Sequence, residues 1–192
     1  MVCVDEQPVQ LLKETRTPLA ATKDRPPRID YEYERHGTAS IFMFCEPKSG
    51  WRQATARPQR TKADWALEVA ALLDGRYADR EKIVLVSDHL NTHARGAFYE
   101  AFSPERARAL LRRLEFRHTP QHGSWLNVAE CERSVMTRQC LLDRRLGTVA
   151  ELQAELAAWH ARQNARQRGV NGHFTIDDAR RKLKSVHPKI IA

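Results

Sequence analysis

The stretch that decides the fold is Lys82-Ile-Val-Leu-Val-Ser-Asp-His-Leu-Asn-Thr-His93. Its first half is a short run of β-branched and other apolar residues, which is typical of a buried strand. Its second half is polar and begins with Asp88, so the strand carries a carboxylate at its own end. We therefore interpret the rest of the chain in relation to Asp88.

Three strands are expected before this one. Met1–Asp5 is a β-branched run that ends in an acid. Ala39–Cys45 and Trp51–Ala56 flank a turn at residues 47–50, which predicts an antiparallel hairpin. Residues 13–38 are highly charged and contain three prolines, so we predict a long loop there rather than a helix.

Helices are expected where a capping residue precedes apolar residues at helical spacing. Five such helices begin at Thr61, Ser103, Ser124, Thr148 and Thr175. The first is expected to end at Gly75, the third near Leu141, the fourth near residue 166 and the fifth near residue 186. A short strand at 114–119 follows the second helix. This order predicts an α/β domain whose mixed five-stranded sheet has three antiparallel strands first and helices on both faces.

Charge and composition narrow the class of protein. The 192 residues carry a formal net charge of +8, and residues 160–192 hold eight Lys or Arg against two Asp. This surplus favours a polyanionic partner, and a solvated basic face is the alternative.

No long apolar segment or secretion signal is present, so we expect a cytoplasmic protein with no membrane contact. No glycine-rich phosphate loop occurs, so no nucleotide cofactor is expected. The four scattered cysteines predict reduced, mostly buried thiols.

Three acids are the candidates for chemistry. If the strands that end at Asp5 and Asp88 are neighbours with aligned ends, their carboxylates lie side by side, which requires a cation. Hard oxygen ligands of this kind suit Mg²⁺ or Mn²⁺. Helix periodicity places Glu130 on the inward face of the third helix and Glu132 on the opposite side. The alternatives are loop or cap roles for the two aspartates and a salt bridge from Glu130 to Arg133.

Histidines also gather around these acids. His89 with His93, and His118 with His122, are spaced by four residues, but both pairs lie at strand ends and turns, where this spacing does not build a zinc site. We expect His93, together with Asn91, to order the turn after Asp88 or to contact a DNA phosphate. The turn before the Glu130 helix gives His122 a similar expected role.

Several segments together resemble one known family. They are Val-Cys-Val-Asp-Glu (2–6), Tyr-Glu-Tyr-Glu-Arg-His-Gly-Thr-Ala (31–39), Ser-Asp-His-Leu-Asn-Thr-His (87–93), His-Thr-Pro-Gln-His-Gly-Ser-Trp-Leu-Asn-Val-Ala-Glu (118–130) and Phe-Thr-Ile-Asp-Asp-Ala-Arg-Arg-Lys-Leu-Lys (174–184). In this order they resemble the DDE transposases of the mariner superfamily, in particular its bacterial insertion-sequence branch. The similarity covers essentially the whole chain.

The resemblance implies a fold, a reaction and a set of ligands. It implies a ribonuclease-H-like core in which Asp5, Asp88 and Glu130 hold two Mg²⁺ or Mn²⁺ ions. The implied reaction is hydrolysis of a phosphodiester at each insertion-sequence end, followed by attack of the freed 3′-hydroxyl on target DNA. The implied partners are double-stranded DNA, at element ends and target, and further copies of the chain in a homodimer or larger complex.

We expect a catalytic domain at 1–167, with the long loop at 13–38, and a basic helical tail at 168–192. Candidate DNA contacts in the tail are Arg180, Arg181, Lys182 and Lys184. Family members commonly have Asn after the second Asp, where this chain has His89. Full-length members also carry a helix-turn-helix region before the first Asp, so we expect the chain to be the catalytic half alone. An inactive remnant that binds DNA or full-length transposase as an inhibitor is one alternative, and a stand-alone ribonuclease-H-like nuclease is another.

Overall fold

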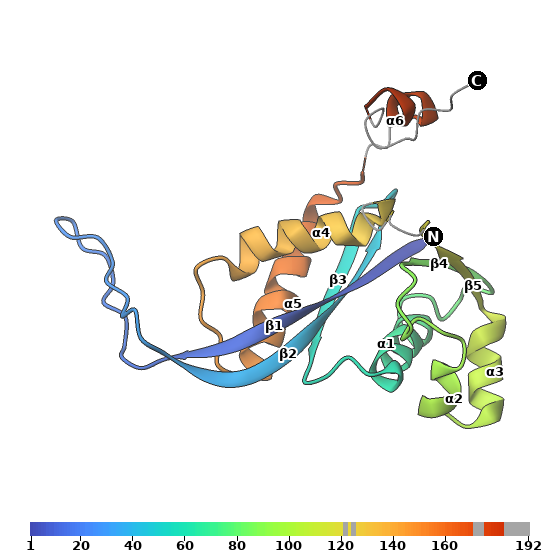
Figure 1. The fold of residues 1–192 in the computed structure, drawn as a ribbon, viewed down its shortest axis with the longest axis horizontal. Coiled ribbons are helices and arrows are strands. Elements are labelled where there is room, and N and C mark those ends of the chain that lie inside the picture. The colour runs from blue at the N-terminus through green and yellow to red at the C-terminus, as the bar shows by residue number, and fades with distance from the viewer. Residues whose placement is uncertain (121–122, 124–125, 171–174, 183–192) are drawn as a thin grey trace, which may run out of the picture.

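The computed structural model describes residues 1–120, 123, 126–170 and 175–182 (Figure 1). Its centre is a five-stranded sheet in the order β3-β2-β1-β4-β5. β1 pairs antiparallel with β2, and β2 with β3, whereas β4 pairs parallel with β1 and with β5. The predicted mixed α/β sheet is therefore confirmed. The strands are β1 (Val2–Glu14), β2 (Tyr33–Glu46), β3 (Trp51–Arg57), β4 (Ile83–Ser87) and β5 (Leu114–His118).

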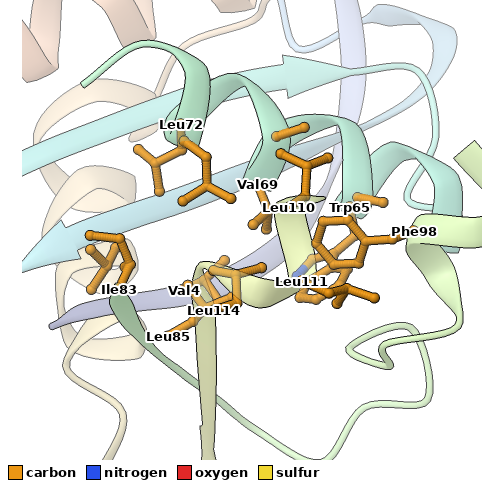
Figure 2. Close-up of a cluster of buried hydrophobic side chains, with 14 of the residues drawn as sticks. Val4, Trp65, Val69, Leu72, Ile83, Leu85, Phe98, Leu110, Leu111 and Leu114 are labelled. Carbon is orange, nitrogen blue, oxygen red and sulfur yellow. The ribbon is translucent and has the colours of Figure 1, made fainter. Parts of the chain in front are cut away.

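Helices cover both faces of this sheet (Figure 1). They are α1 (Lys62–Asp74), α2 (Ala97–Ala101), α3 (Pro104–Arg112), α4 (Val128–Met136) with a π-helical turn η2 (Thr137–Leu141), α5 (Val149–Arg166) and α6 (Ile176–Lys182). One core lies under α1, α2 and α3 (Figure 2). A second core lies under α4, η2 and α5. Because side chains alternate along a strand, Val2 and Val4 enter the first core and Cys3 enters the second.

The expected loop at 13–38 was partly wrong. β1 continues to Glu14 and β2 begins at Tyr33, and the two strands remain paired out to these residues. Isolated bridges join Leu19 to Arg28 and Thr22 to Arg25 nearer the tip. Figure 1 shows the result, a twisted two-stranded arm that extends away from the body. Backbone hydrogen bonds between its two strands hold this arm together. Because such bonds do not depend on apolar side chains, the sequence of the arm contains no apolar alternation that would predict a strand.

The helix ends test the capping predictions. Both predicted capping boxes form, Thr61 with Asp64 and Thr148 with Glu151, and Ser103 caps α3. The third helix begins at Val128, later than predicted, and its cap is Asn127, whose side chain accepts a hydrogen bond from the Ala129 amide. The predicted cap Ser124 lies outside the described residues. The short helix α2 was not predicted.

The remaining sequence expectations concern thiols and membranes. All four cysteines are free, and three of them are buried while Cys131 is exposed, as predicted. In the part of the chain that the structure describes, no helix combines the length and apolar character needed to cross a bilayer.

Candidate active site

Asp5 and Asp88 occupy neighbouring strands with matched register. β1 and β4 run parallel, with Val2 beside Leu85 and Cys3 beside Val86. The same offset carried two residues beyond Cys3 aligns Asp5 with Asp88. Cys3 and Val86 both belong to the core beneath α4 and α5, so alternation places the two aspartates on that same face. The sheet therefore brings the two carboxylates to neighbouring positions, as predicted, but the prediction that Asp5 ends its strand was wrong, because β1 continues to Glu14.

The Asp5 carboxyl lies in an environment that disfavours its negative charge. Burial raises its pKa to about 6, the charge of Arg133 partly offsets this, and the charges of Glu6 and Asp88 raise the pKa further. Its Oδ2 is buried and forms no hydrogen bond to any described residue. The Arg133 Nε lies 3.0 Å from that oxygen, but without the alignment of a hydrogen bond, so the contact is an ion pair only.

Glu130 lies at the rim of this site rather than inside it. Its side chain is 34% exposed, so the prediction that it packs inward was wrong. The Arg133 Nη2 lies 3.7 Å from Glu130 Oε1, and the Arg133 Nε contacts Asp5. The predicted alternative, a Glu130–Arg133 salt bridge, is thus present as a long contact. Arg133 supplies the positive charge between the two carboxylates.

The outward position predicted for Glu132 was also wrong. Its carboxylate is buried and forms two hydrogen bonds with the Arg52 guanidinium, one of them 2.7 Å long. This partner lies 80 residues away in the sequence, on β3. A buried carboxylate is tolerated only where such a partner satisfies it, and helix periodicity alone does not reveal that partner.

His93 connects Asp88 to a second buried carboxylate. Its Nε2 lies 2.7 and 2.9 Å from the two carboxylate oxygens of Glu6, and its Nδ1 lies 2.8 Å from Asp88 Oδ1. The imidazole is fully buried and packs against the Trp65 ring, with centroids 5.4 Å apart. Burial alone would lower the pKa of His93, but the hydrogen bond and charge of Glu6 and the charge of Asp88 together raise it.

These contacts decide between the two roles expected for His93. A buried ring with both nitrogens engaged orders the turn after Asp88 and is not available to a DNA phosphate. The amide of Leu90 and His93 both contact Oδ1 of Asp88, which leaves Oδ2 without a partner among the described residues. The side chain of Asp88 is about one third exposed, so that oxygen is accessible.

The other candidate residues are more dispersed. Asn91 is exposed. Arg180 and Arg181 are exposed on α6 and form ion pairs with Asp177 and Asp178 of the same helix. Lys182 ends α6, and His122 and Lys184 lie outside the described residues. The rings of His89 and His118 stack with centroids 4.8 Å apart.

The carboxylates of Asp5, Asp88 and Glu130 are chemically suited to a hard divalent cation, although the three side chains do not converge on one point among the described residues. Among the described residues, no group of three or more His, Cys, Asp and Glu side chains is close enough to hold a metal ion. Asp5 Oδ2 is nevertheless buried without a hydrogen bond, and Glu130 is free at the rim except for its long contact with Arg133. Carboxylate oxygens with unused acceptor capacity are the ligands that Mg²⁺ and Mn²⁺ prefer.

Sequence reasoning missed two residues of this site. Arg133 was considered only as a partner of Glu130, and Glu6 was not considered. The signal for Glu6 was present: it follows Asp5 in a buried strand, so alternation sends its carboxylate into the opposite core, where it requires a partner. No local pattern identified that partner as His93.

Comparisons with known proteins identify a family and a similar fold. The sequence profile described as "DDE superfamily endonuclease" matches residues 1–153. A search of curated protein sequences gives no significant match.

The fold is similar to that of solved mariner proteins. In a pre-cleavage Mos1 transpososome, the similarity covers 96% of this chain and 55% of the Mos1 chain at 13% identity, with a TM-score of 0.57. In a Mos1 mariner paired-end complex with Mn, it covers 86% and 50%, at 13% identity and a TM-score of 0.52. This chain thus spans about half the length of the solved chains that it matches. On the strength of the profile match, which covers most of its length, the chain belongs to the DDE superfamily endonucleases.

Proposed function

We propose that this chain is the catalytic domain of a mariner-type transposase of an insertion sequence, with Asp5, Asp88 and Glu130 as its catalytic and metal-binding acids. Its reaction is cleavage of a DNA phosphodiester at the element ends and transfer of the freed 3′ end to target DNA. The proposed domain is 1–167. The basic tail at 168–192 binds DNA, and the active complex contains two or more copies of the chain.

One observation carries this proposal. Asp5 of β1 is aligned with Asp88, the residue directly after β4, and the Asp5 pKa of about 6 reflects burial beside other carboxylates, with Arg133 as its counter-charge among the described residues. Such an arrangement destabilises the free protein and is strongly relieved by a cation. Perturbed carboxylates of this kind cluster at functional sites.

The residues of the chain divide the work as follows. Asp5, Asp88 and Glu130 would hold two Mg²⁺ or Mn²⁺ ions, which when bound activate the attacking oxygen and stabilise the leaving oxygen. His93 orients Asp88 through Oδ1 and leaves Oδ2 for binding. Glu130 is a third exposed and held only by its long contact with Arg133, so its side chain can turn toward the aspartates. Arg133 contacts Asp5 at present and is placed to meet a DNA phosphate once released from it.

A second candidate function rests on the same contact. If Arg133 holds Glu130 and Asp5 permanently, the chain binds DNA without cutting it and acts as an inhibitor of full-length transposase. This candidate predicts salt-sensitive duplex binding without metal-dependent cleavage.

The test is nicking of supercoiled plasmid DNA in the presence of Mn²⁺. We expect the wild-type chain to nick and Asp88→Asn to be inactive, with an unchanged melting temperature. The matched control is Asp79→Asn, an exposed acid in the turn before β4, which should nick at the wild-type rate. Nicking that persists in Asp88→Asn would refute the assignment. Salt-sensitive binding without nicking by the wild-type chain would favour the inhibitor.

A further inference from the structure

Two adjoining hollows follow the free edge of the sheet, where β5 is the last strand. They have volumes of about 500 and 220 Å³ and share Arg95, Leu111 and Arg112 in their walls. Lys82 lines the larger hollow and Arg108 lines the smaller one. Together they form one open groove, which we call the β5 groove.

The four cations of the β5 groove lack partners. Lys82, Arg95, Arg108 and Arg112 form no ion pair and no side-chain hydrogen bond with any described residue. The acid in the wall, Glu115, is already paired with Arg117. All four cations are exposed, whereas the buried Arg52 is neutralised by Glu132. The groove is therefore a concentrated, uncompensated positive surface, and it favours a polyanion.

The spacing of these cations suits an extended ligand rather than a compact one. Arg108 and Arg112 lie one helical turn apart on α3, about 6 Å along the axis. Lys82 lines the larger hollow, Arg108 lines the smaller one, and Arg95 and Arg112 line both, so the cations follow the length of the joined hollows.

The floor of the groove is apolar. It is formed by Leu111, Leu114 and Phe116, and the Arg95 guanidinium lies 5.6 Å from the centroid of the Phe116 ring. Tyr99, about half exposed, stands at the other side. An apolar floor beneath a row of cations fits sugar–phosphate backbone, whose deoxyribose is apolar and whose phosphates are charged.

We propose that the β5 groove binds the sugar–phosphate backbone of duplex DNA, without regard to sequence. The inference rests on the proposed function, because that function makes DNA the substrate. Contacts to phosphates fix the register of a duplex and carry no sequence information.

The test compares two pairs of arginines in the intact chain. Arg108→Gln with Arg112→Gln removes the groove pair. Arg162→Gln with Arg166→Gln is the matched control, because both residues are exposed at i, i+4 spacing on α5, which covers the opposite face of the sheet. Binding of a fluorescent duplex of arbitrary sequence is measured by anisotropy between about 50 and 200 mM salt. Melting temperatures confirm that both variants fold.

We expect the groove variant to bind the duplex at least tenfold more weakly, and its plot of log affinity against log salt to be shallower by about 2, since two phosphate contacts are lost. The control should keep the wild-type slope.

A groove variant with unchanged affinity and slope would overturn the inference while leaving the proposed function intact. A wild-type chain that binds no duplex would instead overturn both. If duplex binding is unchanged but binding of polyglutamate is lost in the groove variant, the groove recognises an acidic peptide and the inference is wrong.

Discussion

Asp5 and Glu6 are consecutive buried residues of β1, yet their carboxylates face opposite sides of the sheet and have different partners. Glu6 is paired at 2.7 Å with a buried histidine beneath α1. Asp5 faces α4, has a raised pKa and leaves Oδ2 without a hydrogen bond. The difference teaches that burial of an acid does not by itself indicate a site: the carboxylate of Glu6 is satisfied by a protein partner, whereas that of Asp5 keeps an oxygen without a hydrogen bond and is the proposed metal ligand.

The largest expected effect separates these two acids by activity. Asp5→Asn should lower Mn²⁺-dependent nicking by at least about a thousandfold, because a metal contributes several kcal/mol to transition-state stabilisation and each 1.36 kcal/mol is tenfold in rate. Plasmid nicking in single-turnover conditions measures it. Nicking within tenfold of the wild-type rate would remove Asp5 from the site.

The same contrast recurs on α4 and is tested by stability. Glu132→Gln should cost about 3–5 kcal/mol, because it leaves Arg52 as a buried charge without its partner. Glu130→Gln, on the same helix, should change the unfolding free energy by no more than about 0.5 kcal/mol and should abolish nicking. Urea unfolding of both variants provides the measurement. Equal losses of stability would contradict the division into structural and proposed metal-binding acids.

The raised pKa of Asp5 gives a prediction about pH. The folded protein holds this proton up to pH about 6, whereas the unfolded chain releases it near its ordinary value of 3.8. The folded state therefore binds more protons in that window, and its stability falls as pH rises through it. Asp5→Asn removes this loss and should stabilise the protein by about 3 kcal/mol at pH 8.

Urea unfolding in EDTA checks this prediction at two pH values. The advantage of Asp5→Asn should be present at pH 8 and should vanish only well below pH 3.8, where wild-type Asp5 is protonated in both states. The control Asp79→Asn should show no such dependence. An Asp5→Asn variant that is less stable than wild type at pH 8 would contradict the pKa assignment.

The smallest expected effect concerns His93. In His93→Asn, the side-chain amide occupies the position of Nδ1 and can still contact Asp88. In His93→Gln, the amide occupies the position of Nε2 and can still contact Glu6. His93→Gln should therefore weaken Mn²⁺ binding by about 10–100-fold, the usual effect of losing a residue that orients a metal ligand. His93→Asn should bind Mn²⁺ more tightly than His93→Gln but melt at a lower temperature. Titration calorimetry and thermal unfolding measure the two effects, and the reverse ranking would contradict the assigned roles.

Much of the fold was predictable because it depends on local interactions. The β-branched runs at Met1–Asp5 and Lys82–Ser87 form neighbouring strands, and the capping boxes at Thr61 and Thr148 begin helices. The length of the β1–β2 arm was not predictable, because paired backbones hold it without an apolar pattern.

The sequence by itself determined that Asp5 lies in an apolar strand, that Asp88 follows another and that Glu130 lies on a helix, since periodicity and capping act over a few residues. Only the tertiary structure decided that Glu6 meets His93, that Glu132 meets Arg52 and that Arg133 stands between Asp5 and Glu130. The Glu6–His93 and Glu132–Arg52 contacts join residues 87 and 80 positions apart. The electrostatic environment of a buried charge depends on everything packed around it, which no local pattern contains.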